Sequence, residues 1–274
     1  MLLSFTKMHG LGNDFIVFEA SDATLPDAAR WRQLADRRTG IGFDQALVLQ
    51  PPKRTATDLY YRIFNADGSE VEQCGNGARC IASLVAQQRG TQQLRMDSLG
   101  GLINAELRAD GQVALDMGIP DFNPAALPFI ADAAADSYRI AVNGQQVDIG
   151  AVSMGNPHAV LLVADVTTAA VATLGPALEI HARFPLRVNV GFMQIVSIEQ
   201  INLRVFERGV GETQACGTGA CAAVAVGRKR GVLADTVRVN LPGGQLSIHW
   251  SGPGAHLWMT GPAVSVFKGQ VELS

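Results

Sequence analysis

Hydrophobic residues in the first quarter of the chain fall into short runs separated by polar and turn-forming residues. Runs of aliphatic and aromatic side chains occupy residues 2–5, 15–18, 46–49 and 59–64. Short apolar runs of this kind, bounded by residues that interrupt regular structure, are typical of β-strands. We therefore predict four strands in this part of the chain, the first of them within residues 1–10.

The apolar pattern changes after Cys74. Ile81, Leu84 and Val85 recur at the spacing of one helix face, and an Arg-Gly pair at 89–90 marks the end of such a helix. We predict a helix that begins near Cys74 and ends near residue 90.

A second helix is predicted after Cys216. Residues 220–226 are almost all Ala and Val, and a basic Arg-Lys-Arg turn at 228–230 and Gly231 follow them. A basic last turn with a glycine beyond it is typical of a helix C-terminus. Because this helix is apolar on nearly every side, we expect it to be buried all round.

The two predicted helices belong to a repeat that spans the chain. Phe64 is followed ten residues later by a Cys-Gly-x-Gly-Ala turn at 74–78, and Phe206 is followed ten residues later by the same turn at 216–220. The two cysteines are 142 residues apart, and Gly12-Asn13 and Gly100-Gly101 recur 143 residues later as Gly155-Asn156 and Gly243-Gly244. This constant register indicates two homologous lobes of about 140 residues each. The predicted fold class is α+β, with each lobe a curved, mostly antiparallel sheet around a central helix.

Composition narrows the class of protein further. The chain has 274 residues, of which 47% are hydrophobic, and a net charge of −3, which argues against a strongly basic protein that coats nucleic acid. No apolar run reaches the roughly 18 residues of a membrane span, and residues 1–10 lack the apolar stretch and cleavage site of a signal peptide. Four cysteines in a chain of this kind suggest a reduced, cytoplasmic protein whose thiols need individual explanations.

Cys74 and Cys216 are the two thiols that stand at predicted helix starts. The N-terminus of a helix presents unpaired backbone N–H groups and a partial positive charge, which favour a thiolate. The neighbouring glycines would let a carboxylate or phosphate approach the same amides. Cys80 and Cys221 lie inside the helical runs, and we interpret them as packing residues.

Two equivalent acid/base groups suit the racemisation or epimerisation of a stereocentre. One thiolate removes a proton from a carbon, and the opposite thiol returns a proton to the other face. Pyridoxal phosphate, the usual helper for such chemistry, needs a Schiff-base lysine, and none of the four lysines (Lys7, Lys53, Lys229 and Lys268) stands beside a recognisable phosphate-binding turn. Helix-end amides that bind the substrate carboxylate could stabilise the enolate-like charge instead.

Other thiol chemistries remain as alternatives. A thioredoxin-like or zinc site would need CxxC pairs, whereas the cysteines of each lobe are six and five residues apart. A cysteine hydrolase would pair one thiol with a histidine such as His158, but this leaves the second cysteine turn unexplained.

Five segments of the chain together resemble the diaminopimelate epimerase family. They are Gly10-Leu11-Gly12-Asn13-Asp14-Phe15, Phe64-Asn65-Ala66-Asp67-Gly68, Cys74-Gly75-Asn76-Gly77-Ala78-Arg79-Cys80, Met154-Gly155-Asn156-Pro157-His158, and Glu207-Arg208-Gly209 with the run from Gly211-Glu212-Thr213 through Ala220. The resemblance covers essentially the whole chain. The duplication alone would also fit relatives of the same fold, such as proline racemase-like enzymes that act on other amino acids. The resemblance implies an isomerase that interconverts LL- and meso-2,6-diaminopimelate in lysine and peptidoglycan precursor synthesis, without pyridoxal phosphate and without metal.

The resemblance also assigns roles to individual residues. Cys74 and Cys216 match the proton-transferring pair, and His158 and Glu207 match positions that assist them. The positions that match substrate-binding residues are Asn13, Gln45, Asn65, Gly75, Asn76, Asn156, Asn189, Glu207, Arg208, Gly217 and Thr218. Arg208 and the asparagines could hold the distal carboxylate of the substrate, and Glu207 could accept from its ammonium group.

The family further implies how the lobes are divided and how the protein assembles. The expected N-terminal lobe is 1–118, the expected C-terminal lobe is 119–262, and the strand 263–274 is expected to return to the first lobe. A homodimer is expected through this last strand. Phe267 stands where relatives often carry Tyr, so the apolar ring is kept and the hydroxyl is lost.

Overall fold

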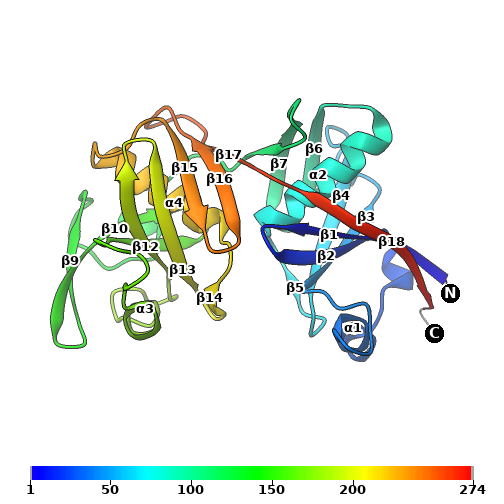
Figure 1. Cartoon of the computed structure of the whole chain (residues 1–274), viewed down its shortest axis with the longest axis horizontal. Coiled ribbons are helices and arrows are strands. Elements are labelled where there is room, and N and C mark those ends of the chain that lie inside the picture. Colours follow the sequence, from blue (N-terminus) through cyan, green and yellow to red (C-terminus); the bar gives the residue numbers. More distant parts are fainter. Residues whose placement is uncertain (1, 273–274) are drawn as a thin grey trace. The chain divides into compact units, whose positions relative to one another are not determined.

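The computed structural model describes residues 2–272 of the chain. Met1 of the segment expected at 1–10, and residues 273–274 of the strand expected at 263–274, lie outside the described residues. The chain divides into two compact units: lobe 1, from Met1–Leu115 with Gly261–Ser274, and lobe 2, from Asp116–Thr260. Each lobe holds one long helix, α2 or α4, among strands (Figure 1).

Lobe 1 is built from two helices and a set of twisted strands. Its elements are β1 (Leu2–Gly10), β2 (Asn13–Glu19), a short 3-10 turn (Asp22–Thr24), α1 (Ala28–Ala35), β3 (Gln45–Gln50), β4 (Leu59–Asn65), β5 (Glu70–Val71), α2 (Gly75–Arg89), β6 (Gln93–Ser98), β7 (Gly101–Leu107), β8 (Val113–Asp116) and β18 (Val264–Glu272). β1 pairs with both β2 and β18, β3 pairs with β2 and β4, and β4 pairs with β5 and β6.

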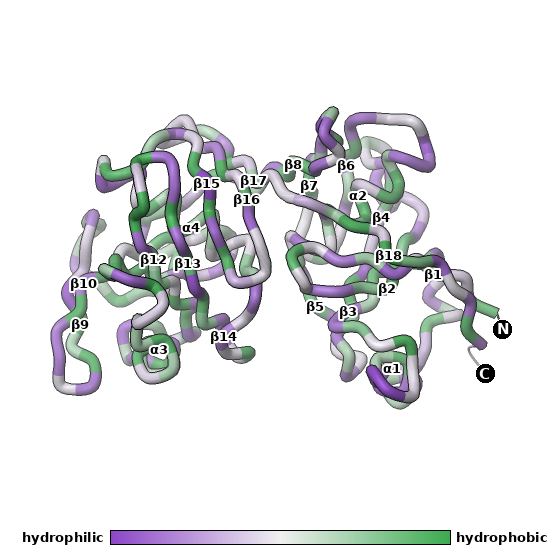
Figure 2. Tube along the Cα trace, in the orientation of Figure 1, coloured by the Kyte–Doolittle hydropathy of each residue, from purple (hydrophilic) through white to green (hydrophobic). Residues whose placement is uncertain are grey.

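Lobe 2 repeats this plan. Its elements are a 3-10 turn (Pro124–Ala126), β9 (Tyr138–Val142), β10 (Gln145–Ser153), β11 (Pro157–Leu162), α3 (Val171–Glu179), β12 (Asn189–Ser197), β13 (Gln200–Glu207), β14 (Gly211–Thr213), α4 (Gly217–Lys229), β15 (Thr236–Leu241), β16 (Gly244–His249) and β17 (Trp258–Gly261). β10 pairs with β9 and β11, β12 pairs with β11 and β13, and β13 pairs with β14 and β15. β13 alternates polar and half-buried with apolar and buried residues, so its tube in Figure 2 changes colour along the strand.

The strand pairings confirm the duplication that the sequence register predicts. β10 to β17 repeat the pairings of β1 to β8, with α3 in the place of α1 and α4 in the place of α2. In each lobe one further strand pairs with the first strand of the repeat, and this strand comes from a different part of the sequence in the two lobes. β9 precedes β10 in the chain, whereas its counterpart β18 is the last strand of the chain and pairs antiparallel with β1.

The expected α+β class, with mostly antiparallel sheets, is confirmed. Among the described residues the parallel pairs are β2–β3, β4–β6, β11–β12 and β13–β15. Parallel neighbours need a crossover connection, and a helix lies in each of these four connections: α1, α2, α3 and α4 in turn. The expected strands are present, and β1 and β2 are longer than their apolar runs because the register of the hairpin continues to Gly10 and Asn13.

α2 and α4 are the central helices of their lobes. α4 buries every residue from Gly219 to Gly227, as its all-round apolar pattern predicts, and it packs against β10, β11 and β12. Gly150 on β10 permits this close approach, because a Cβ there would lie 2.3 Å from a methyl carbon of Val226. α2 ends at Gly90, which takes the left-handed conformation of a helix C-cap (φ 65°).

Neither long helix is a membrane span. Between residues 2 and 272, no helix is both long and apolar enough to cross a bilayer.

Candidate active site

Cys74 caps the N-terminus of α2. Its backbone is extended (φ −150°), and its Sγ accepts a hydrogen bond of 3.4 Å from the backbone N–H of Gly77. The same sulfur lies 3.6 Å from Oδ1 of Asn13, with the thiol as donor. Cys74 is half-buried, whereas the other three cysteines are buried. The sequence-based prediction of a cysteine at a helix start is therefore confirmed for α2.

Cys216 caps α4 in the same way. Its Sγ accepts from the backbone N–H of Gly219 at 3.4 Å and lies 3.7 Å from the hydroxyl of Thr218. Cys216 is only 4% exposed. Burial raises the pKa of this thiol well above its ordinary value, the Glu207 carboxylate raises it further, and the contacts with Thr218 and Gly219 oppose the change.

The raised pKa of Cys216 corrects one expectation from the sequence. A helix N-terminus was expected to favour the thiolate of each cap cysteine. For Cys216 the N-terminal amides do act in that direction, but removal of the sulfur from water outweighs them because a buried anion loses its hydration. Cys80 on α2 shows the same effect of burial, which raises its pKa to about 12. Cys80 and Cys221 are both fully buried, in agreement with a packing role.

Each cap turn contains a glycine at a position where a side chain would collide with its neighbours. A Cβ on Gly219 would lie 2.9 Å from a methyl of Val205 and 3.2 Å from the sulfur of Cys216, and a Cβ on Gly77 would lie 3.0 Å from a methyl of Leu47. Gly75 and Gly217 are the first residues of α2 and α4, so their amides belong to the N-terminal turns, where an anion is favoured.

The polar residues expected in lobe 1 form two adjoining groups. Asn13, the first residue of β2, accepts at Oδ1 from Nδ2 of Asn76 at 3.3 Å and from the Cys74 thiol. Gln45 and Asn65 face each other across β3 and β4, and Nε2 of Gln45 donates to Oδ1 of Asn65 at 2.9 Å. The buried Oε1 of Gln45 has no hydrogen-bond partner, which leaves an acceptor for a donor group of a ligand.

The polar residues expected in lobe 2 surround Cys216 and the start of β12. Asn156 donates from Nδ2 to the hydroxyl of Thr218 at 3.4 Å, and its Oδ1 lies 2.9 Å from Nε2 of His158. Asn189 accepts at Oδ1 from the backbone N–H of Arg208 at 3.0 Å and donates to a carbonyl at the start of β11. The Arg208 side chain is exposed, and its Nη1 donates to the backbone carbonyl of Leu186 at 3.2 Å.

His158 is buried as a neutral ring. Burial lowers its pKa to about 3, and the nearby Arg208 charge lowers it in the same direction. Because the amide oxygen of Asn156 can only accept, Nε2 of His158 must carry the proton in this hydrogen bond. In this arrangement the histidine is uncharged at neutral pH, and its Nε2–H donates to Oδ1 of Asn156.

Glu207 is the carboxylate of lobe 2 that acts on Cys216. It is the last residue of β13, half-buried, and its Oε1 accepts a short hydrogen bond of 2.6 Å from the Thr213 hydroxyl. The Glu207 carboxylate raises the pKa of Cys216 through its charge and through a hydrogen bond with the thiol.

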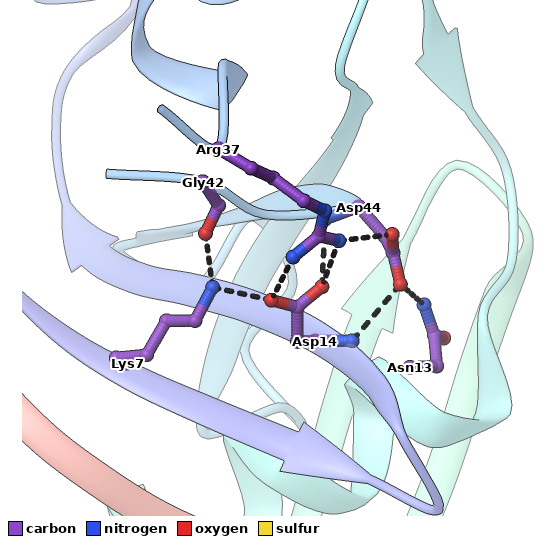
Figure 3. Close-up of polar contacts among 6 residues, drawn as sticks. All are labelled: Lys7, Asn13, Asp14, Arg37, Gly42 and Asp44. Carbon is purple, nitrogen blue, oxygen red and sulfur yellow. Dashed lines mark hydrogen bonds and ion pairs between the residues drawn. The ribbon is translucent and has the colours of Figure 1, made fainter. Parts of the chain in front are cut away.

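A charged cluster next to Asn13 was not predicted from the sequence. Figure 3 shows Lys7, Arg37 and Asp44 gathered around the Asp14 carboxylate. Arg37 donates to Asp14 at 2.7 Å and to Asp44 at 2.6 Å, and Lys7 pairs with Asp14. Although partial burial opposes it, these hydrogen bonds and charges hold the pKa of Asp14 well below its usual range. The adjacency of Asp14 to Asn13 was a local signal, but Arg37 and Asp44 come from a distant loop.

In the part of the chain that the structure describes, no group of three or more His, Cys, Asp or Glu residues is arranged to hold a metal ion.

Comparison with known sequences identifies the family. The profile described as diaminopimelate epimerase matches residues 5–123 and 150–266. The chain is 57% identical to the diaminopimelate epimerase of Pseudomonas entomophila and 55% identical to that of Pseudomonas aeruginosa, in each case over the full length of both chains. The chain belongs to the diaminopimelate epimerase family. The predicted family resemblance is thereby confirmed, and both cysteine turns lie within the matched residues.

Solved structures show that the fold is wider than the family. A hydroxyproline epimerase from Agrobacterium vitis superposes with a TM-score of 0.69 at 16% identity, and the match covers 98% of this chain and 92% of that one. A probable proline racemase from Agrobacterium radiobacter gives a TM-score of 0.70 at 16% identity, with coverage of 99% and 93%. These likenesses confirm the duplicated fold; the sequence relatives single out the diaminopimelate epimerases within it.

Proposed function

We propose that the chain interconverts LL- and meso-2,6-diaminopimelate through proton transfer by Cys74 and Cys216, as a step in lysine and peptidoglycan precursor synthesis. The observation that carries this proposal is the repetition of one unusual turn. Each lobe places a cysteine at the N-cap of its central helix, with the sulfur on the amide of the residue three positions later. The relatives named diaminopimelate epimerase, at 57% and 55% identity over the full chain, supply the substrate.

The reaction needs only the two thiols as proton carriers. One cysteine thiolate takes the α-proton, and the electron pair of the broken C–H bond stays on the carbon as an enolate-like charge. The other cysteine gives its thiol proton to the opposite face of that carbon and becomes the thiolate. The reverse reaction exchanges the two roles. The raised pKa of Cys216 favours its protonated form, which suits the direction of reaction in which this residue gives its proton.

Backbone and side-chain groups supply the rest of the site. The amides of Gly75 and Asn76 and those of Gly217 and Thr218, at the two helix starts, suit the carboxylate at the reacting carbon. In the proposed site Glu207 accepts from the distal ammonium group of the substrate, and the Arg208 guanidinium donates to the distal carboxylate. The remaining positions expected to bind substrate serve its polar groups as donors and acceptors: Asn13, Gln45, Asn65, Asn156 and Asn189. Neither pyridoxal phosphate nor a metal takes part in this scheme.

A stereochemical assay in deuterium oxide tests the function. LL-diaminopimelate given to the purified chain should yield the meso isomer with deuterium at one α-carbon. Cys74→Ala and Cys216→Ala should each abolish isomerisation, whereas Cys80→Ala and Cys221→Ala, which change the two packing thiols, should retain it. Racemisation of proline with no turnover of diaminopimelate would overturn the proposed substrate. Full activity in Cys74→Ala would overturn the two-thiol mechanism.

We also propose that the protein works in the cytoplasm as a homodimer assembled through β18. Among the described residues, β18 has β1 as its one strand partner, and most of its side chains are exposed. Val264, Val266 and Phe267 are 42%, 56% and 48% exposed, although Phe267 also packs edge-on against Phe5 at 6.0 Å. An apolar edge strand of this kind is suited to pairing with a second copy.

A further inference from the structure

A one-way series of hydrogen bonds passes through the amides of Asn76 and Asn13. Nη2 of Arg79 donates to Oδ1 of Asn76 at 2.8 Å, and Nδ2 of Asn76 donates to Oδ1 of Asn13 at 3.3 Å. Nδ2 of Asn13 in turn donates to Oδ2 of Asp44 at 2.9 Å. A guanidinium can only donate and a carboxylate can only accept, so the two charged ends determine which way both amides point.

Both ends of this series are held in place. Arg79 is fully buried on α2, and its Nε donates to the carbonyl of Pro262 at 3.2 Å. Asp44 accepts from Arg37 at 2.6 Å and from the backbone N–H of Asp14 at 3.1 Å, as Figure 3 shows. Neither end can turn away without breaking a hydrogen bond that involves a charged group, and these are the stronger ones.

The orientation of the Asn13 amide determines whether its oxygen or its NH₂ group lies next to the Cys74 sulfur. With Nδ2 bound to Asp44, the amide presents Oδ1 to Sγ of Cys74 at 3.6 Å. An oxygen that accepts from a thiol stabilises the protonated sulfur, and it repels the lone pairs of a thiolate. An amide turned by 180° would present its NH₂ group and have the opposite effect.

Lobe 2 shows that this orientation is not a general property of the duplicated turn. Asn156, the counterpart of Asn13, presents Nδ2 to Thr218, the counterpart of Asn76, at 3.4 Å. Its Oδ1 is held by Nε2 of His158 at 2.9 Å. The two equivalent asparagines therefore have opposite amide orientations. Asp44 fixes that of Asn13, and His158 fixes that of Asn156.

We propose that Arg79 and Asp44 are positioning residues that fix the amide of Asn13 with its oxygen toward Cys74 and so favour the protonated form of this thiol. Both residues act through the asparagines and touch no reacting atom. The role of Cys74 as a proton carrier comes from the proposed function, on which the catalytic meaning of this inference rests. The orientation itself can be measured without any substrate.

The test is the pH dependence of thiol alkylation. The purified chain is treated with iodoacetamide between about pH 6 and pH 10, and the labelled peptides are quantified by mass spectrometry. Asp44→Asn keeps the shape of the side chain but offers Asn13 a donor as well as an acceptor. We expect the alkylation midpoint of Cys74 to fall by about half a pH unit to one unit, which corresponds to the loss of one hydrogen bond. Cys216, measured in the same digests, should keep its wild-type extent of labelling at each pH.

A double-mutant cycle separates orientation from simple loss of charge. In an Asn13→Ala background, Asp44→Asn should produce no further shift at Cys74, because the connecting amide is absent. An equal shift with and without Asn13 would show that the Asp44 charge acts directly and would overturn the proposal. An unchanged midpoint in Asp44→Asn would also overturn it.

Arg79→Met tests the other end of the series: loss of the Asn13 orientation lowers the same midpoint, whereas loss of the Arg79 charge alone raises it and would count against the proposal. Because Arg79 is fully buried, thermal unfolding is measured first. If this variant does not fold, the half-exposed Asp44 carries the test alone. Isomerisation of diaminopimelate by the wild-type chain is assayed separately. Its absence would refute the proposed function, whereas the alkylation midpoints would still decide the orientation of Asn13.

Discussion

The hydroxyl of Thr213 donates a hydrogen bond of 2.6 Å to Oε1 of Glu207 across the β13–β14 hairpin. Thr213 is paired in register with Val205, which lies two residues before Glu207 and therefore on the same face of β13. A short hydrogen bond to a carboxylate fixes both its direction and its charge. Thr213 thus fixes the orientation of the Glu207 carboxylate, the group that acts on Cys216.

Thr213→Val should slow isomerisation. Valine keeps the branched shape but lacks the hydroxyl, so Glu207 becomes free to rotate away from its position. A hydrogen bond to a charged group contributes about 1.5–3 kcal/mol, and we expect kcat/KM to fall roughly 10-fold or more. Thr213→Ser, which keeps the donor, is the matched control and should retain most of the activity. Equal losses in both variants would point to packing and not to the hydrogen bond.

Glu207→Gln should lower the pKa of Cys216. Burial is the largest cause of the raised value and the Glu207 carboxylate is the next, so neutralising it removes part of the increase. Cys216 should then react with iodoacetamide at a lower pH than in the wild type, although burial keeps the pKa above its ordinary value. Glu212→Gln is the control, because Glu212 is engaged by Arg204 at 2.6 Å. A pH profile that moves in both variants would contradict the assignment.

His158 should make the folded state sensitive to acid. The pKa of His158 is lowered from 6.5 to about 3 in the folded state. Between about pH 6.5 and pH 3, His158 is therefore protonated in the unfolded chain and neutral in the folded chain. The free energy of unfolding should therefore decrease as the pH falls, by about 2 kcal/mol between pH 7 and pH 5 from this residue. Urea unfolding at both pH values measures the change, and His158→Gln should lack this contribution. Identical losses in wild type and variant would show that His158 is not the cause.

Val266→Glu should weaken the proposed dimer. The side chain is 56% exposed on β18, and a charge there would be desolvated or repelled if two copies of this strand meet. Sedimentation at several concentrations should show dimer for the wild type and a shift toward monomer for the variant. Val210→Glu, at a 75% exposed valine in the β13–β14 turn, is the control and should remain dimeric. Dissociation in Val210→Glu alone would place the interface elsewhere.

Local signals made the two cysteine turns predictable from the sequence. The Cys-Gly-x-Gly pattern contains the cap, the glycines that let the turn form, and the start of an apolar helix within a few residues. The constant register then extended the prediction from one turn to a duplicated fold. Gly90, in the left-handed conformation, ends α2 where the Arg-Gly pair indicated.

Features that depend on distant residues were not predictable in this way. Asp44 meets Asn13 across 31 residues of sequence, and only the parallel pairing of β2 with β3 brings them together. α3 contains Gly175 and Pro176, which normally interrupt a helix pattern, and it persists because Val171 and Leu178 are buried in the lobe 2 core. The raised pKa of Cys216 depends on burial, which a sequence pattern does not specify.

β18 belongs to lobe 1 but follows lobe 2 in the sequence, so it is synthesised after lobe 2. Lobe 2 is one continuous stretch of chain, Asp116–Thr260, and all of its strands have been made before β18 leaves the ribosome. Lobe 1 begins first but lacks β18, one of the two strand partners of β1, until residues 264–272 have been made. One edge of β1 is therefore open to wrong pairing while lobe 2 is synthesised. Lobe 1, whose synthesis begins first, can complete its sheet only after lobe 2 has been made.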